Sequence, residues 1–283
     1  MKRIGVLGAG TMGSGIAHTA ALAGFEVTLF DTKDGQVERA VEQIHGRLRR
    51  QAETGRLDAD VVADTMARLH PADTLDAFQT VEAAIEAVLE VMDVKRQAFV
   101  ELDHRLPPEA LLATNTSSLS ITALAQATSR PERVVGLHFF NPAPVMRLIE
   151  VVRGEDTSDA TVKEALALAR ALGKEPVLVQ KDTPGFVVNR VLMPLFIEAI
   201  RILEEGIASR EDIDRAVKLG LNHPMGPLTL ADLTGLDVDL NVMDYMFDEM
   251  KDARFAAPLT LRRLVRAGRL GRKSGRGFYE YKA

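Results

Sequence analysis

Short apolar runs alternate with longer amphipathic stretches over the first two thirds of the chain. Runs that suit buried strands occupy residues 4–7, 27–30, 84–88, 111–114, 134–137, 148–152 and 177–179. Helical patterns lie between several of them, at residues 12–23, 94–102 and 161–172. Strands and helices that alternate in this way are typical of an α/β fold with a doubly wound, mostly parallel sheet.

A long polar and helical insertion, residues 36–69, interrupts this alternation after the second strand. Gly55 lies near its middle, and glycine is a frequent break between helices. We therefore expect two helices that stand away from the sheet as a hairpin.

The pattern changes after Pro184 and Gly185, a dipeptide that commonly ends regular structure. Helical stretches follow at residues 186–205, 210–219, 228–250 and 259–267, and a short strand is expected at 278–281. The sequence therefore predicts an α/β domain over residues 1–184 and an all-helical domain over residues 185–283.

Composition excludes several classes of function. The 283 residues are 46 % apolar and 27 % charged, which is ordinary for a globular protein, and the net charge of −5 gives no reason to expect a nucleic-acid partner. The chain has no cysteine, so thiol catalysis and cysteine-ligated metals are excluded. Its six histidines show no close pair at ligand spacing, so we expect no metal site.

The chain has no run that suits a membrane span, so no membrane partner is expected. Residues 4–25 are uncharged, but glycines such as Gly8, Gly10, Gly13 and Gly15 interrupt the run, whereas a secretory signal needs an unbroken apolar helix. We expect a cytoplasmic protein.

The first strand leads directly into a glycine-rich turn and a helix. Gly8, Gly10 and Gly13, with Thr11 and Met12 between them, form G-x-G-x-x-G. In such a turn the first glycine permits the tight bend, the second lets a pyrophosphate approach the backbone, and the third lets helix and strand pack closely. The N–H groups at the start of the helix attract the phosphates. A Rossmann-type dinucleotide site is therefore predicted.

Asp31 lies at the end of the second strand, 18 residues after Gly13. A carboxylate there can accept a hydrogen bond from a ribose 2′-hydroxyl and would repel a 2′-phosphate. The next residue is Thr32 rather than an arginine, so NAD is favoured over NADP.

His138 is the candidate base for a dehydrogenase reaction, because imidazole exchanges protons near neutral pH. It follows the 134–137 strand, and Glu150 lies twelve residues later within an apolar run. A carboxylate in such a run needs a partner, and a carboxylate–imidazole pair would fix the ring. A hydrogen-bonded loop histidine with a solvent-facing Glu150 is the alternative.

Further polar residues follow other strands. Asn115 and Ser117 belong to a cluster after the 111–114 strand that can bond a cofactor or substrate oxygen, or cap the next helix. Asn189 interrupts an apolar stretch at the start of the helical domain, where it faces a cleft or satisfies local backbone.

Two basic clusters suit phosphate ligands, subunit contacts or simple solvation. The first, on the helical insertion, contains Arg49, Arg50 and Arg56, and we favour a nucleotide tail as its ligand. The second spans residues 261–276 with seven basic residues and no acid.

Taken together, these motifs resemble the 3-hydroxyacyl-CoA dehydrogenase family, particularly its short-chain bacterial 3-hydroxybutyryl-CoA branch. The resemblance covers essentially the whole chain in order. It is carried by the glycine turn, residues 114–119, the run from His138 through Asn141 to Glu150, residues 182–186 with Asn189 and Arg190, residues 224–227 with Ala231 and Asp232, and residues 271–279.

The resemblance implies that His138 is the general acid/base and Glu150 its charge partner. Ser117 and Asn189 would hold the 3-oxygen and thioester region of the substrate, and Asn141 would frame the pocket. Glu90, Lys95 and Asn115 would surround the NAD ribose and nicotinamide, a set that also includes Ser117.

The family grips coenzyme A at the helical insertion, often through lysine. Here that place reads Glu53, Thr54, Gly55 and Arg56, so one or more of the arginines of the first basic cluster would substitute. The helical domain of the family pairs with its copy, which implies a homodimer.

The resulting hypothesis is NAD-dependent interconversion of a short-chain (S)-3-hydroxyacyl-CoA, such as 3-hydroxybutyryl-CoA, and the 3-oxoacyl-CoA, such as acetoacetyl-CoA. The alternatives are a dehydrogenase of a free 3-hydroxy acid and a non-catalytic NAD-binding protein of the same fold. The first commonly uses a lysine base, where this chain offers Arg190; the second has no need of a base and its partner.

Overall fold

The computed structural model describes residues 1–281 and divides into two compact units, Met1–Asp182 and Thr183–Ala283. The division falls between residues 182 and 183, and the sequence pattern places the boundary between residues 184 and 185. Each unit is described by itself.

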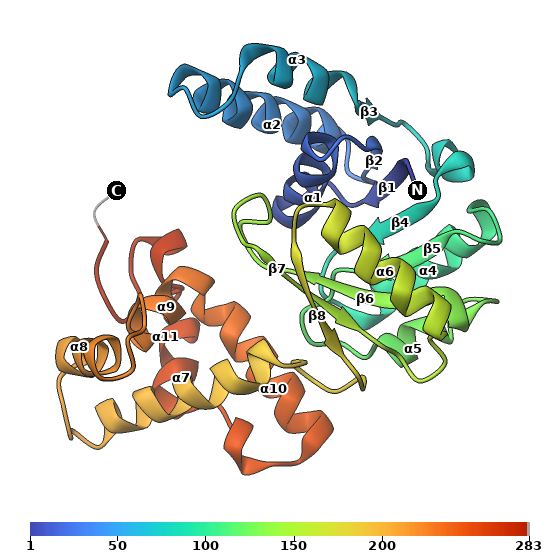
Figure 1. Ribbon diagram of the computed structural model, residues 1–283. Helices are drawn as coiled ribbons and strands as arrows, with labels where there is room; N and C mark the ends of the chain where they lie inside the picture. Colours follow the sequence, from blue (N-terminus) through green and yellow to red (C-terminus); the bar gives the residue numbers. More distant parts are fainter. Residues whose placement is uncertain (282–283) are drawn as a thin grey trace. The chain divides into compact units, whose positions relative to one another are not determined.

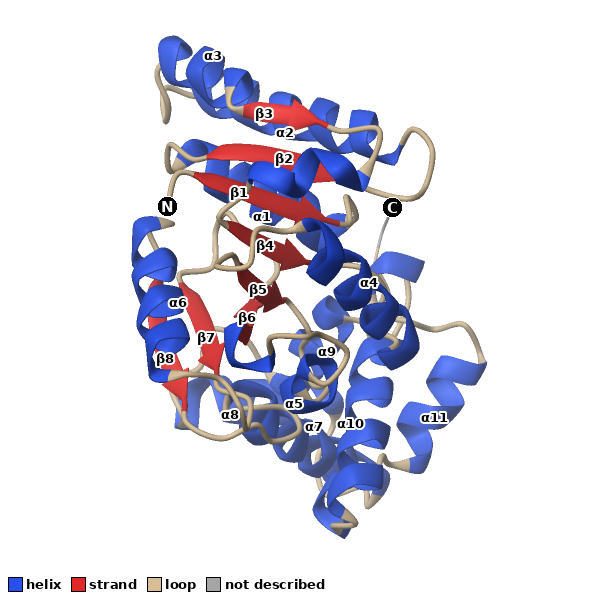
Figure 2. Cartoon of the chain, turned by 90° about the vertical axis from the view of Figure 1, so that its right-hand side faces the viewer, coloured by secondary structure: helices blue, strands red, loops and turns tan. Residues whose placement is uncertain are grey.

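The first unit is built on an eight-stranded sheet with the order β3-β2-β1-β4-β5-β6-β7-β8 (Figure 2). The strands are β1 (Arg3–Leu7), β2 (Glu26–Phe30), β3 (Leu69–Pro71), β4 (Ala83–Glu86), β5 (Leu111–Thr114), β6 (Val134–Phe139), β7 (Leu148–Val152) and β8 (Glu175–Val179). All neighbouring strands are parallel except β6 and β7, which are antiparallel. The predicted α/β, mostly parallel sheet is confirmed.

Six α-helices accompany this sheet. They are α1 (Thr11–Leu22), α2 (Gln36–Glu53), α3 (Ala59–Ala67), α4 (Met92–Arg105), α5 (Ile121–Ala125) and α6 (Asp159–Ala171). Helix α1 packs on β1 and β2, α4 on β4 and β5, and α6 on β6, β7 and β8 (Figure 1). Because helices cover the strands, most strand residues are buried, and the strands read as nearly continuous hydrophobic runs.

The order of the strands reverses beside β1. The chain continues from β1 to β2 and β3 on one side, and then returns to β4 on the other. Ligands of open α/β sheets bind outside the carboxyl ends of the strands at such a reversal. The fold therefore presents the glycine turn after β1 and the loop after β4 at the place where a cofactor binds.

Three details of this unit differ from the expectations. The short strand β3 was missed, because its three residues directly follow α3 and only Leu69 is buried. Strand β6 continues to Phe139, so His138 lies within the strand rather than after it. The hairpin of α2 and α3 does not stand clear of the domain, since Ile44 and Leu48 are fully buried and belong to the same core as the sheet.

The second unit contains the helices α7 (Val188–Glu204), α8 (Arg210–Gly220), α9 (Pro227–Thr234), α10 (Leu236–Met250) and α11 (Leu259–Arg266). Phe196, Met243 and Phe255 are among the residues of its core. The single helix expected over residues 228–250 is two helices, because Gly235 between them has φ 106°. The strand expected at 278–281 is absent; within the described residues this segment forms only an isolated bridge, between Arg276 and Glu280.

The segment after α11 is fixed by a buried carboxylate rather than by sheet pairing. Asp232 accepts hydrogen bonds from the N–H of Phe278 and Tyr279 and from the hydroxyl of Tyr281, all at 2.9 Å. A Cβ atom on Gly277 would lie 1.9 Å from Oδ1 of Asp232. The glycine in this position therefore allows the chain to pass close enough to bond the carboxylate.

Candidate active site

The glycine turn after β1 contains two glycines that the fold itself requires and one that it does not. Gly8 has φ 102°, and a Cβ there would lie 2.6 Å from the carbonyl oxygen of Ala87. A Cβ on Gly13 would lie 1.8 Å from the carbonyl oxygen of Gly8. A Cβ on Gly10 would meet no described atom within 4 Å. The space beside Gly10 is therefore open to a ligand.

Helix α1 begins at this turn with its first N–H groups uncapped by a side chain. Gly10 is the N-cap residue, Thr11 and Met12 open the helix, and its first turn has no acidic residue. Free N–H groups and the positive end of the helix dipole favour a phosphate at this point. Together with the open space at Gly10, they fit a dinucleotide pyrophosphate.

Asp31 follows β2 and lies beside the same turn. Its Oδ2 accepts the N–H of Ala9 at 2.7 Å, and its Oδ1 accepts the N–H of Lys33 at 2.8 Å. These bonds fix the carboxylate at the edge of the turn, and each oxygen keeps acceptor capacity for a ribose hydroxyl.

A buried lysine joins two carboxylates, one at the carboxyl end of β4 and one in the loop that follows it. Lys95 and Glu86 are 1 % and 0 % exposed, and Nζ of Lys95 lies 2.7 Å from Oε1 of Glu86 and 3.2 Å from Oε2 of Glu90. Glu86 also accepts the hydroxyl of Thr114 at 2.7 Å. Glu86 was missed from the sequence, although it is a carboxylate within an apolar run, the same signal that singled out Glu150.

Glu90 in turn holds the segment that follows β5. Its Oε1 accepts the hydroxyl of Thr116 at 2.6 Å and both the N–H and the hydroxyl of Ser117 at 2.7 and 3.0 Å. Burial opposes ionisation of Glu90, but Lys95, Thr116 and Ser117 together lower its pKa below the ordinary value. An ionised Glu90 therefore fixes the position of Ser117.

Asn115 connects this segment with β6. Its Oδ1 accepts the N–H of Phe139 at 2.9 Å, and its own N–H donates to the carbonyl of Glu86. The structure thus brings Glu90, Lys95, Asn115 and Ser117 together and places them beside the end of the strand that carries His138.

His138 and Glu150 are direct partners across the antiparallel pair of β6 and β7. Nδ1 of His138 lies 2.7 Å from Oε2 of Glu150, and the residues are 5 % and 0 % exposed. The ring of Phe140 lies 4.4 Å from the imidazole, centroid to centroid. A buried carboxylate on Nδ1 fixes the orientation of the ring and stabilises it when it carries a second proton. The alternative of a solvent-facing Glu150 is wrong.

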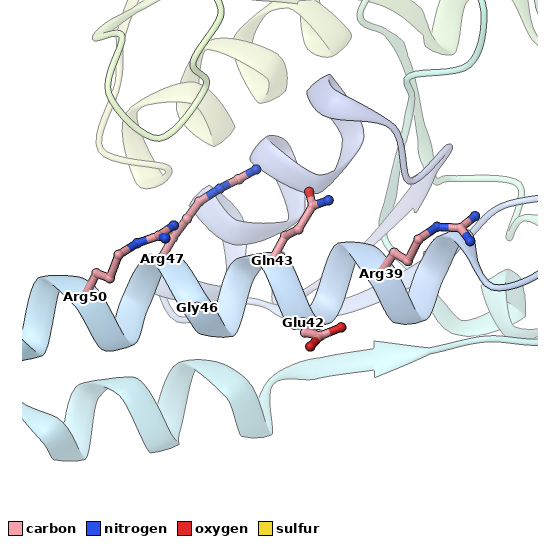
Figure 3. Close-up of a pocket in the computed structure, with 6 residues that line it drawn as sticks. All are labelled: Arg39, Glu42, Gln43, Gly46, Arg47 and Arg50. Carbon is pink, nitrogen blue, oxygen red and sulfur yellow. The ribbon is translucent and has the colours of Figure 1, made fainter. Parts of the chain in front are cut away.

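The basic side chains of α2 form a shallow groove along one side of the helix. The groove is lined by Arg39, Glu42, Gln43, Gly46, Arg47 and Arg50. Figure 3 shows the three arginines and Gln43 directed to one side of α2, whereas Glu42 points to the other. Of the three arginines expected to meet a phosphate ligand, Arg50 lines this groove.

The other two expected arginines do not line it. Arg49 lies 3.4 Å from Glu53 in an ion pair along the helix, and Arg56 follows the end of α2. Arg39 and Arg47 were not selected as site residues, although the spacing of residues 39, 43, 47 and 50 follows the helical period and places them on one face.

Asn141 and Asn189 are the remaining residues expected at the site. Asn141 is exposed in the loop after β6, and Asn189 is half-buried as the second residue of α7.

Among residues 1–281, no group of three or more His, Asp or Glu side chains is arranged to hold a metal ion. No helix in that part of the chain is long and apolar enough to cross a membrane.

Two family models match the chain in succession. The model for the 3-hydroxyacyl-CoA dehydrogenase NAD binding domain matches residues 3–183, and the model for the 3-hydroxyacyl-CoA dehydrogenase C-terminal domain matches residues 185–281. The first match and the open glycine turn agree that the cofactor is NAD.

Curated and solved relatives match over the whole length. A probable 3-hydroxybutyryl-CoA dehydrogenase of Bacillus subtilis is 47 % identical over 281 residues, 99 % of this chain and 98 % of the relative. The crystal structure of Mycobacterium tuberculosis FadB2 superposes with a TM-score of 0.97 at 44 % identity, covering 100 % of this chain and 99 % of that one. The structure of (S)-3-hydroxybutyryl-CoA dehydrogenase PaaH1 from Ralstonia eutropha gives 0.96 at 43 % identity and covers 100 % of both chains.

Proposed function

The chain belongs to the 3-hydroxyacyl-CoA dehydrogenase family and is an NAD-dependent oxidoreductase, and we propose that it interconverts (S)-3-hydroxybutyryl-CoA and acetoacetyl-CoA. Full-length similarity to enzymes named for 3-hydroxybutyryl-CoA supports this substrate. The single observation that carries the proposal is the buried His138–Glu150 pair, whose Nδ1 and Oε2 are 2.7 Å apart, because a protein that only binds NAD has no use for it.

His138 is the general acid/base of the proposed reaction. Glu150 holds Nδ1, so the proton exchanged with the substrate is carried by Nε2, the other ring nitrogen. In the oxidation direction Nε2 takes the proton of the 3-hydroxyl, and the ionised Glu150 stabilises the resulting imidazolium. In the reduction direction the same nitrogen returns the proton to the 3-oxygen.

Ser117, Asn141 and Asn189 hold the substrate in this proposal. Ser117 is positioned by Glu90 at 2.7 and 3.0 Å, so its hydroxyl is ordered before substrate binds. Asn189 contributes an amide that bonds the thioester region, and Asn141 frames the pocket. Ordered polar groups of this kind raise the rate because they need no reorganisation in the transition state.

The NAD site is assigned to the first unit. Gly8, Gly10, Gly13, Thr11 and Met12 hold the pyrophosphate at the start of α1, and Asp31 accepts the adenosine ribose hydroxyls. Glu90, Lys95, Asn115 and Ser117 surround the nicotinamide ribose and ring. When bound, the nicotinamide supplies the carbon that exchanges a hydride with C3 of the substrate.

The groove on α2 is the proposed site of the coenzyme A phosphates. Arg39, Arg47 and Arg50 line it with one acid, Glu42, which points to the opposite side of the helix. Guanidinium groups bind phosphate through paired N–H donors and keep their charge at all physiological pH values. This arrangement makes Arg50 the first candidate among the three arginines expected from the sequence, with Arg39 and Arg47 beside it.

We further infer a cytoplasmic homodimer formed through the helical unit. This unit exposes large apolar side chains, among them Val191 at 70 %, Ile207 at 67 % and Leu219 at 78 % exposed, and such surfaces favour association. Light scattering of the purified protein tests it: a mass near twice 30.9 kDa is expected, and a monomer at micromolar concentration contradicts it.

The decisive assay mixes the purified protein with NADH and acetoacetyl-CoA and follows the loss of nicotinamide absorbance. NADPH and free acetoacetate are the controls. Oxidation of NADH with the CoA ester alone is expected. Activity with free acetoacetate would favour the free-acid dehydrogenase, and NADH binding without turnover across a chain-length series would favour the non-catalytic alternative.

A further inference from the structure

A loop of residues 140–147 joins the two strands that carry His138 and Glu150. Its own hydrogen bonds are short in range, since the N–H groups of Val145 and Met146 both donate to the carbonyl of Pro142, at 2.9 and 3.0 Å. Val145 is 72 % exposed and Met146 is 40 % exposed. The interior of the loop therefore does little to fix its position, and contacts from other elements must do so.

Lys174 provides such a contact from the turn between α6 and β8. Its Nζ donates to the carbonyl oxygen of Ala143 at 2.6 Å and to that of Met146 at 2.8 Å. The residue is 8 % exposed, and burial lowers the pKa of its ammonium group. No carboxylate of residues 1–281 forms an ion pair with it. Since a buried charge is costly, the two carbonyl dipoles of the loop are its compensation.

Helix α1 also contacts this loop. A Cβ on Gly15 would lie 3.1 Å from the Cβ of Ala143 and 3.4 Å from Cδ of Pro144. Ala143 is 2 % exposed. The loop thus contacts both Lys174 and α1, the helix that begins at the glycine turn. These contacts connect the strands that carry His138 and Glu150 with that helix.

The neighbouring turn completes the attachment of the loop. The N–H of Glu175 donates to the carbonyl of Arg147 at 2.8 Å, where β8 begins to pair with β7. The turn that carries Lys174 therefore bonds Ala143, Met146 and Arg147. Both the middle and the end of the loop depend on this one short segment.

We propose that Lys174 is a positioning residue for the reaction: by holding loop 140–147 against α1, it sets the place of His138, Asn141 and Glu150 relative to the bound cofactor. The proposal rests on the proposed function, because the proton transfer at His138 is the step that it supports. A misplacement of about 1 Å at a reacting group can cost on the order of 100-fold in rate. Loss of the anchor should therefore appear in turnover before it appears in cofactor binding.

The test compares Lys174→Met, which keeps length but removes the donors, with Lys174→Arg, which keeps them. Lys163→Met is the matched control, because Lys163 is exposed on α6. In Lys174→Met we expect kcat for acetoacetyl-CoA reduction to fall by about 10- to 100-fold, with the NADH Kd and the KM for acetoacetyl-CoA within about twofold. Lys174→Arg should recover most of kcat, and Lys163→Met should match the wild type.

Two results would overturn the proposal. One is an unchanged kcat in Lys174→Met. The other is a Lys174→Met protein whose thermal stability and NADH affinity fall together with kcat, because general destabilisation would then explain the loss of turnover. If Lys174→Met does not fold, Lys174→Gln replaces it, and kcat must then decrease from lysine through arginine to glutamine at constant NADH Kd.

A separate readout distinguishes failure of this proposal from failure of the proposed function. If the wild type does not turn over acetoacetyl-CoA, the function is wrong, and the anchor is tested by tryptic cleavage after Arg147, whose side chain is 80 % exposed. Cleavage should be faster in Lys174→Met than in Lys163→Met. Equal cleavage rates would show that Lys174 does not fix the loop.

Discussion

The imidazole of His138 and the carboxylate of Glu150 face each other across β6 and β7, the pair at which the sheet becomes antiparallel. An antiparallel pair places the two Cα atoms opposite each other and directs both side chains to the same face of the sheet. The backbone register therefore fixes the pair, and neither residue needs a flexible loop to reach its partner.

Replacement of His138 by glutamine should abolish nearly all turnover while NADH still binds. Glutamine approximates the size and hydrogen bonding of the ring but cannot act as an acid or base, and general acid–base catalysis contributes about 100- to 10,000-fold. Steady-state kinetics and NADH fluorescence titration measure the two effects. His104→Gln is the control, because His104 is exposed on α4. Normal turnover in His138→Gln would show that His138 is not the general base.

Replacement of Glu150 by glutamine should also lower kcat strongly, by about 100-fold or more, because an amide cannot stabilise an imidazolium at His138. The double variant should be no slower than His138→Gln alone, since Glu150 acts through the ring and residues that work as a unit are not additive. A double-mutant cycle on kcat tests this. Additive losses would mean that Glu150 acts independently of His138.

A carboxylate inside an apolar run suggested this pair but left a solvent-facing Glu150 as the alternative, and the family resemblance decided between the two. Neither observation could predict the geometry of the pair. Apart from His138 and Glu150 themselves, strands β6 and β7 carry no polar side chain, and a strand buried on both faces has this pattern whether its neighbours are parallel or antiparallel. Nothing in the pattern therefore marked the reversal of direction at β7. The same signal is present at Glu86 but was not recognised. Its partner, Lys95, lies on a helix, where a lysine does not by itself indicate a buried ion pair.

Other parts were missed for different reasons. The arginine groove was obscured because Arg47, Arg49 and Arg50 are close in sequence, whereas the helical period separates Arg49 from the face that the groove occupies. Lys174 gave no signal, since a lysine in a turn after a helix is ordinarily solvated. Its burial depends on a loop about 30 residues earlier in the chain, a contact that exists only after folding.

Two variants in the glycine turn test cofactor binding and folding separately. Gly10→Ala adds a methyl group that meets no described atom within 4 Å. We expect an unchanged Tm but a weaker NADH Kd, by about tenfold or more, because the methyl group occupies the approach of the pyrophosphate.

Gly13→Ala is the counterpart, because its methyl group would lie 1.8 Å from the carbonyl of Gly8. Overpacking of this kind costs about 1–3 kcal/mol, so its Tm should fall clearly. Thermal unfolding and NADH titration of both variants are the measurements. A Gly10→Ala protein that binds NADH normally would place the pyrophosphate elsewhere.

Removing the charge of single arginines on α2 tests which of them binds a coenzyme A phosphate. Arg50→Gln should raise the KM for acetoacetyl-CoA by about 10- to 100-fold, the loss expected for a charge-assisted hydrogen bond of about 1.5–3 kcal/mol, with kcat unchanged. Arg49→Gln is the matched control one residue away, since Arg49 pairs with Glu53 outside the groove. Both KM values are measured at two salt concentrations. Equal effects of the two variants would contradict the groove as the phosphate site.

His18 provides a prediction about stability and pH that is independent of catalysis. Both of its ring nitrogens are buried without a hydrogen-bond partner in the described chain, and the residue is 1 % exposed. Burial, and then the charges of Arg47 and Lys174, lower its pKa from 6.5 to about 4. The folded protein therefore holds His18 neutral, although the unfolded chain would protonate it below pH 6.5.

The direction in which pH changes the stability follows from this difference in proton binding. Between pH 6.5 and 4 the unfolded state binds the additional proton, so stability is lost as the pH falls through this window and is retained above it. The loss at the lower end is about 3 kcal/mol. Chemical denaturation at pH 7 and at pH 4 measures it, with His18→Gln as the comparison, because glutamine does not titrate. The stability of the wild type relative to His18→Gln should decrease by that amount at the lower pH. An unchanged difference would mean that His18 accepts its proton in the folded state, and that Arg47 and Lys174 do not exclude it.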